Sequence, residues 1–297
     1  MKTVGILIKR NIKLYFKDRG MFFTSLITPM ILLVLYATFL GNVYWDSFVS
    51  GLPEGMSVPG DVIEGLVAGQ LISSLLAVSC ITVAFCSNFL MVQDRANGSI
   101  KDLMISPVAS SKLSVSYYIA TLSSTFIISL AAMALCLVYA FTTAWYMSAA
   151  DVLFLLADIA LLVLFGTALS SVINFFLSTQ GQISAVGSIV SAGYGFICGA
   201  YMPVSSFGDG MQKLVSVLPG TYGTSLVRNH ALRGVLDEME SIGIPRDAID
   251  SFRDTLDCNV YFFGKSVSIS AMFIILAASA VLLAAVYILL NRFKKKI

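Results

Sequence analysis

Charge is what this sequence has least of. Only 12% of its 297 residues are charged, whereas 57% are hydrophobic. A soluble domain carries about 25% charged residues, so about half of the usual charge is missing. The apolar residues gather in runs of about 18 residues or more, the length that a membrane-spanning helix requires. The composition therefore excludes an ordinary soluble domain and predicts a polytopic membrane protein.

Histidine and cysteine are too scarce to build a reactive site. The one histidine, His230, is expected in an external helix, and alone it forms neither a metal site nor a Ser/His/Asp set. Of the five cysteines only Cys258 falls outside the apolar runs, so no external disulfide is expected, and no CxxC suggests a metal. We expect no catalytic, metal or cofactor-binding residues in this chain, and no enzyme activity of its own.

The apolar runs predict an all-α protein with six transmembrane helices. The runs are 21–40, 62–92, 114–140, 149–177, 182–202 and 267–291. The first is longer than the apolar region of a signal peptide, and GNVYWD follows it instead of a cleavage site, so we expect a retained anchor. The second run is longer than a hydrocarbon core of about 30 Å requires, and it should tilt or project beyond the membrane.

The distribution of Lys and Arg predicts the orientation. With the N-terminus inside, the inner segments are 1–20, 93–113, 178–181 and 292–297, and they hold 13 of the 19 basic residues and three of the 17 acids. The remaining chain holds six basic residues and 14 acids. We therefore expect a multi-pass protein of the cell membrane with both termini in the cytoplasm.

Residues 1–20 form a basic segment with an apolar stripe. Its apolar residues recur at intervals of three and four, and its basic residues, Arg10 among them, occupy the other side. This pattern is typical of an amphipathic helix that lies in the headgroup region of anionic lipid. The alternative is a positively charged tail that only sets the topology.

A short polar helix is predicted between the second and third runs, at about 97–107. In QDRANGSIKDLMISPVASSK, Gly98 and Ser99 belong to a cap region, Pro107 ends the helix, and Ile100, Leu103 and Met104 share one face. These apolar side chains either touch the protein's own helix ends and lipid, or fill a cleft on a cytosolic partner.

Residues between 158 and 222 include candidates for helix packing and for the outer part of a substrate pathway. A stripe of small residues at intervals of four favours close helix packing, within the chain or across a dimer: Gly187, Ser191, Gly195 and Gly199. Asp158 is an acid inside the fourth run, where it is either structural and water-facing or part of a proton relay. The outer segment 201–266 should dip into the membrane near Met202 and Pro203 and continue past Pro219 with Tyr222 at the interface.

The outer segment also carries a predicted amphipathic helix and a false phosphate-loop signal. Ile249, Phe252 and Leu256 share one face of the helix after Pro245. The Gly-Lys-Ser at 264–266 lacks the first glycine of a phosphate loop, because Asn259 occupies that position. We therefore expect no nucleotide site here.

Two groups of motifs together resemble the type 2 permeases of ABC exporters (ABC-2-type transmembrane subunits). The inner connection supplies Asp94, Gly98-Ser99, Asp102-Leu103 and Ser106-Pro107-Val108. After the fifth run come Gly199, Met202-Pro203-Val204-Ser205, Leu218-Pro219-Gly220-Thr221-Tyr222 and Arg228. Lys101, beside a position that is usually acidic, and the long outer segment depart from the family pattern.

The resemblance implies that the inner helix is a coupling helix that docks on a separate ATPase subunit. The implied complex has two ATPase subunits, which hold ATP and Mg, and a second permease that is identical or different. The implied ATPase-coupling residues are Asp94, Gly98, Ser99, Ile100, Asp102, Leu103, Met104 and Pro107. The spans would carry a lipophilic or amphipathic substrate outward, such as a drug, a lipid-like toxin or a lipid-linked glycan; the partners are membrane lipid and these subunits, with no nucleic acid. The alternatives are a membrane sensor or scaffold without transport, and an ion-coupled transporter.

Overall fold

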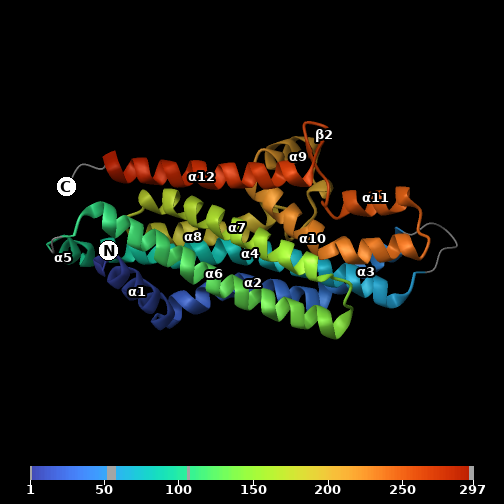
Figure 1. Cartoon of the computed structure of the whole chain (residues 1–297), viewed down its shortest axis with the longest axis horizontal. Helices are drawn as coiled ribbons and strands as arrows, with labels where there is room; N and C mark the ends of the chain where they lie inside the picture. The colour runs from blue at the N-terminus through green and yellow to red at the C-terminus, as the bar shows by residue number, and fades with distance from the viewer. Residues whose placement is uncertain (1, 52–57, 106–107, 294–297) are drawn as a thin grey trace.

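The computed structural model describes residues 2–51, 58–105 and 108–293 (Figure 1). Its elements up to the fourth long helix are α1 Lys2–Lys17, α2 Arg19–Leu35, the π-helical turn η1 Tyr36–Leu40, α3 Gly41–Ser50, α4 Gly60–Ala96, α5 Ser99–Ile105, α6 Ser110–Thr143 and α7 Ala149–Phe175. The rest are α8 Gln180–Ile197, η2 Val204–Ser206, α9 Asp209–Ser216, α10 Pro219–Ser241, α11 Arg246–Thr255, β1 Val260–Phe262, β2 Lys265–Val267 and α12 Ile269–Phe293.

Five helical segments of the described chain are long and apolar enough to cross a membrane. They are Arg19–Ser50, which joins α2, η1 and α3, and helices α4, α6, α7 and α12. The fifth predicted span, 182–202, forms the shorter α8, which opens with Gln180 and Gln182 and is not among these five. Six spans therefore remain a prediction, whereas a mostly helical polytopic membrane fold is established.

Helix α4 is the centre of the bundle. Its 37 residues reach about 55 Å at the helical rise of about 1.5 Å per residue, well beyond a hydrocarbon core of about 30 Å. Helices α2, α6, α7, α8 and α10 all pack on it, and its most apolar stretch is completely buried (Figure 1). A helix that is apolar on every side is expected in such a position.

The outer end of α4 projects into a second, smaller core. There α3, α4, α10 and α11 bury a cluster that includes Phe48, Leu66, Leu232 and Met239. As predicted, Ile249, Phe252 and Leu256 are buried on one side, and they close this core. The excess length of the second run is therefore explained by projection into this outer assembly.

Helix α10 and a hairpin differ most from the sequence-based expectation. The first turns of α10 lie among the spanning helices, because a Cβ on Gly223 would meet Leu162 of α7 and Leu276 of α12. Strands β1 and β2 form an antiparallel pair joined by Phe263 and Gly264, which both have positive φ. A two-residue turn of this kind favours a hairpin. The fold is thus helical with one short hairpin, and the Gly-Lys-Ser lies at its turn.

The start of α1, the end of α12 and helix α5 lie at one end of the bundle (Figure 1). The α3, α10 and α11 assembly lies at the other end, while α9 and the hairpin sit beside the first residues of α12. The molecule therefore has two distinct ends that α4 connects along its whole length.

Candidate functional site

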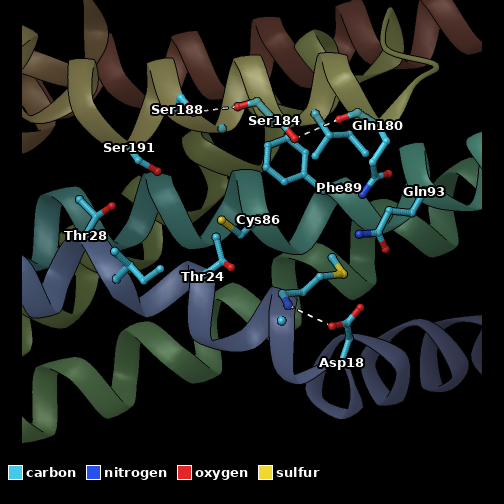
Figure 2. Close-up of a pocket in the computed structure, with 15 residues that line it drawn as sticks. Asp18, Thr24, Thr28, Cys86, Phe89, Gln93, Gln180, Ser184, Ser188 and Ser191 are labelled. Atoms are coloured by element: carbon cyan, nitrogen blue, oxygen red, sulfur yellow. Dashed lines mark hydrogen bonds between the residues drawn. The ribbon is translucent and has the colours of Figure 1, made fainter.

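A groove of about 490 Å³ runs along α4 between α2 and α8 (Figure 2). Its floor is α4, through Cys86, Phe89 and Gln93. Its walls are lined by Met21, Thr24, Ile27 and Thr28 of α2 and by Gln180, Ile183, Ser184, Gly187, Ser188 and Ser191 of α8. This volume lies in the range of small-molecule sites, about 300–1,000 Å³.

The groove combines apolar walls with uncharged polar groups. Hydroxyls of Ser184 and Ser188 donate to carbonyl oxygens of α8 at 3.2 and 3.0 Å, so their lone pairs remain available to a ligand. One acid, Asp18, lies at the inner mouth, where its carboxylate accepts a hydrogen bond from the Met21 N–H at 3.1 Å. Such a lining suits a lipophilic or amphipathic molecule better than an ion.

The four residues of the predicted small-residue stripe lie in different surroundings. Gly187 and Ser191 line the groove, and a Cβ on Gly187 would lie 3.4 Å from Phe89 of α4. The space beside Gly195 is filled by the Tyr201 ring of the same chain. Gly199 lies beyond the end of α8 with φ +74°, which ends the helix, so the four residues do not form one helical packing stripe as predicted.

The predicted coupling helix forms as α5, directly after the inner end of α4. Leu103 is half-buried and packs against the protein's own core, whereas Ile105 is 84% exposed. Asp102 is exposed and Ile100 is half-buried. The Met104 side chain, Ser106 and Pro107 lie outside the described residues. Among the α5 side chains that the structure describes, Ile105 is the apolar one most available to a partner, and the predicted face of Ile100, Leu103 and Met104 does not include it.

Asp94 lies at the inner end of α4 and points into the protein. The Arg10 guanidinium of α1 donates to its carboxylate at 2.8 Å, and the Tyr117 hydroxyl of α6 donates to the same carboxylate. Burial lowers the pKa of Arg10, but Asp94 more than compensates, and the net pKa is raised. Arg10 therefore does not face lipid with the lysines of α1, as the helical pattern predicted. Asp94 instead joins α1, α4 and α6.

Arg95 fastens the same end of α4 to α7. Its guanidinium donates to the carbonyl oxygens of Asn174, Phe175 and Leu177 at 3.2, 2.9 and 3.2 Å. These carbonyls end a helix, where a cation is favoured. Gln93, which lines the groove, is therefore followed directly by the two residues that fasten this end of α4, Asp94 through Arg10 and Arg95 through the end of α7.

Asp158 is buried on α7 and has a partner that the sequence did not indicate. Nδ1 of His230 lies 2.5 Å from its carboxylate, and the Phe154 ring stacks on the imidazole with centroids 4.9 Å apart. Beside them, Arg233 pairs with Asp151 at 2.6 Å. The expectation that His230 is an ordinary polar residue of an external helix is wrong, since α10 packs it against α7.

A second buried ion pair holds the segment after α8. Arg228 is fully buried; it donates to the Gly199 carbonyl at 2.8 Å and pairs with Asp257 at 3.3 Å. Asp257 also accepts from the backbone N–H groups of Val204 and Ser205 at 2.6 and 3.2 Å. Burial raises the pKa of the Asp257 carboxyl, although Arg228 acts in the opposite direction. The turn after Pro203 is thus anchored from two sides.

The remaining outer candidates lie around the start of α10. Pro219 is its first residue, and the buried Tyr222 hydroxyl donates to the Ser216 carbonyl of α9 at 2.5 Å. Met202 is partly exposed. Tyr222 therefore ties α9 to α10 inside the protein, and its position at the membrane interface stays a prediction.

The family model for the ABC-2 type transporter matches residues 2–231, which covers α1 through most of α10. No curated protein matches the chain.

Proposed function

The chain belongs to the ABC-2 type transporter family, whose members are non-catalytic transmembrane permeases that work with ABC ATPase partners, and from this premise we propose that it moves a lipophilic or amphipathic substrate outward through the groove between α2, α4 and α8. A drug, a lipid-like toxin and a lipid-linked glycan all fit this description. Energy comes from two ATPase subunits, one of them docked on α5. Membership in the family also makes this a multi-pass membrane protein.

The observation that carries the proposal is the position of the groove on α4. Gln93 lines the groove, and within the next residues Asp94 and Arg95 fasten the end of the same helix before α5 begins. A push on α5 therefore reaches the groove floor through a single helix. This is a short and stiff connection, as coupling between two sites requires.

A second permease completes the path in this proposal. Helices α2 and α8, which form the walls of the groove, carry exposed apolar side chains such as Ile27, Met30 and Ile31 on α2 and Ile189 on α8. Two copies, or two related chains, that face each other across these surfaces would enclose both grooves. In this arrangement α8 is the sixth span, with the N- and C-termini in the cytoplasm; the start of α1 and the end of α12 lie at the same end of the bundle as α5, which supports an even number of crossings.

The test is co-purification with the ABC ATPase partner. We expect Ile105→Asp to abolish co-purification and substrate-stimulated ATP hydrolysis, because Ile105 is exposed on α5 and supports no contact of the chain's own core. Ile105→Val should behave as the wild type. Ile242→Asp, an exposed residue at the end of α10, is the matched control at the opposite end. Normal docking and coupling in Ile105→Asp would refute the role of α5.

An ion-coupled transporter is the second candidate, and the Asp158 and His230 pair is the observation that favours it. Ionisable residues within spans often mark ion pathways. Transport that stops with a protonophore or in Asp158→Asn, but continues without ATP, would select this candidate. A sensor or scaffold would show neither dependence, since it would move no substrate.

A further inference from the structure

A second groove of about 440 Å³ lies between helices α6 and α12, and neither α2 nor α8 lines it. Ser111, Ser114, Val115 and Tyr118 line it from α6, and Ala284, Tyr287, Ile288, Asn291 and Arg292 line it from α12. Both sets recur at helical intervals of three and four, so each helix presents one face to the groove. No step in the proposed transport uses this groove.

The floor of this groove is a fixed polar and aromatic seam. The Ser114 hydroxyl donates to the Asn291 side chain at 2.7 Å, and the Tyr118 and Tyr287 rings stack with centroids 5.8 Å apart. Tyr287 is buried, whereas Val115 and Ile288 remain exposed along the walls of the groove. The groove is therefore a preformed slot. Its open side faces the membrane around two spanning helices, where lipid acyl chains surround the protein.

The two ends of the slot differ in polarity. One end, at Val115, Ala284 and Ile288, is apolar; the other lies at the first turn of α6 and the last turn of α12, where Ser111, Asn291 and Arg292 meet. Among the described residues no acid pairs with Arg292. The first turn of α6 begins after Ala109, whose side chain caps none of its N–H groups. A cation opposite uncapped helix N–H groups favours a phosphate.

We propose that this groove binds one phospholipid with an anionic headgroup from the inner leaflet. An acyl chain occupies the slot between Val115 and Ile288, and the phosphate lies between Arg292 and the first turn of α6. The depth agrees with this occupant, since the polar end is at the same end of the molecule as α5 and the basic helix α1 (Figure 1). The bound lipid would fill the gap between α6 and α12 and hold the two helices together at their inner ends.

The test is native mass spectrometry of the delipidated full-length chain, titrated separately with dioleoyl phosphatidylglycerol and dioleoyl phosphatidylcholine. The wild type should retain one phosphatidylglycerol per chain with higher affinity than phosphatidylcholine. In Arg292→Gln the two affinities should become equal. The affinity for phosphatidylglycerol should fall about fivefold, because that is the effect of removing about one charge at a membrane surface. Lys17→Gln, which removes a charge on α1 away from the slot, should leave the preference unchanged.

Filling the slot tests the acyl site independently. Ala284→Trp and Val115→Trp each place a large ring in the slot from a different helix, and either should abolish retention of both lipids. Size-exclusion chromatography identifies a variant that does not fold. The acyl site is then tested with the other tryptophan variant. An unchanged lipid preference in Arg292→Gln, or full retention in a folded tryptophan variant, would overturn the proposal; equal retention of the two lipids by the wild type would mean an ordinary annular lipid and would also overturn it.

Discussion

Asp94 is a buried acid at the end of α4 that leads to α5. Its carboxylate is buried, and it receives hydrogen bonds from Arg10 of α1 and Tyr117 of α6. An exposed docking acid would contribute little to the stability of the permease, whereas a buried, paired acid is costly to disturb. We therefore interpret Asp94 as the residue that fixes α1 against the turn leading to α5.

The first prediction is that Asp94→Ala destabilises the protein and weakens coupling. Removal of the carboxylate leaves Arg10 partly buried without its partner, and we expect a loss of about 3 kcal/mol in the free energy of unfolding. Asp94→Asn keeps an acceptor for Tyr117 and should lose less. Thermal unfolding in detergent and ATP hydrolysis per substrate moved are the measurements.

Asp102→Ala is the matched control, because Asp102 is an exposed acid on α5. Its effect on unfolding should stay within about 0.5 kcal/mol. If both alanine variants unfold like the wild type, Asp94 does not hold α1 in place.

Cys258 gives a second prediction at this scale. The side chain is 1% exposed, and burial raises the pKa of its thiol to about 12. Because the thiolate is the reactive form, it should not react with an impermeant maleimide between pH 7 and pH 9, since a thiol with this pKa stays protonated there. Ser206→Cys, which places a thiol at an exposed position, should react fully. Rapid labelling of Cys258 in the folded wild type would show that the outer core is open.

Single residues were predicted well where the local pattern decides their position, and poorly where a distant partner does. The burial of Ile249 and Phe252 follows from helical spacing alone. The helical pattern placed Arg10 with the lysines, because nothing in α1 reveals Asp94, which lies 84 positions away. His230 was missed for the same reason, since its partner Asp158 is on another helix.

At the scale of elements, α10 depends on close backbone contacts. Gly234 lies so near the loop before α7 that a Cβ would overlap the Tyr146 carbonyl oxygen at 1.9 Å. A backbone atom cannot move aside as the end of a flexible side chain can. Helix α10 therefore has its position fixed beside the α6–α7 connection.

The third prediction is that Gly234→Ala destabilises the protein. Overpacking costs typically about 1–3 kcal/mol, and the contact with backbone places this variant at the upper end, despite the higher helix propensity of alanine. Gly181→Ala in α8 has open space around its Cβ and should be neutral or slightly stabilising. Thermal unfolding of the two variants compares them; equal melting temperatures would mean that α10 shifts freely.

The five helical segments that could cross a membrane are all among the six apolar runs of the sequence. Hydropathy did not predict that the first turns of α10 lie among the spanning helices. The five spanning segments are continuous apolar runs, so their physical signal is local. Helix α10 carries Arg228, Asn229 and His230 in succession and therefore looks like an external helix. Arg228 pairs with Asp257 and His230 contacts Asp158, and pairing of that kind is visible only in three dimensions. The hairpin was missed because each strand has only three residues.

At the scale of the whole molecule, α4 joins two ends with different tasks. The inner end has α5 and the clamp of Arg10, Asp94 and Arg95, and the outer end has the core that α3, α10 and α11 build. The groove lies along the inner half of α4 (Figure 2). The central claim is that a contact at α5 changes the groove through this helix.

The most direct test is the labelling rate of a cysteine in the groove within the complex of permease and ATPase. Ser188→Cys is placed on the exposed wall of α8, in a chain in which Cys86 is replaced by serine, because Cys86 lines the same groove. The account predicts that ATP and Mg change the maleimide labelling rate severalfold, and that Ile105→Asp abolishes the change while the nucleotide-free rate stays the same. A rate that does not respond to nucleotide in the coupled, transporting complex would contradict the account.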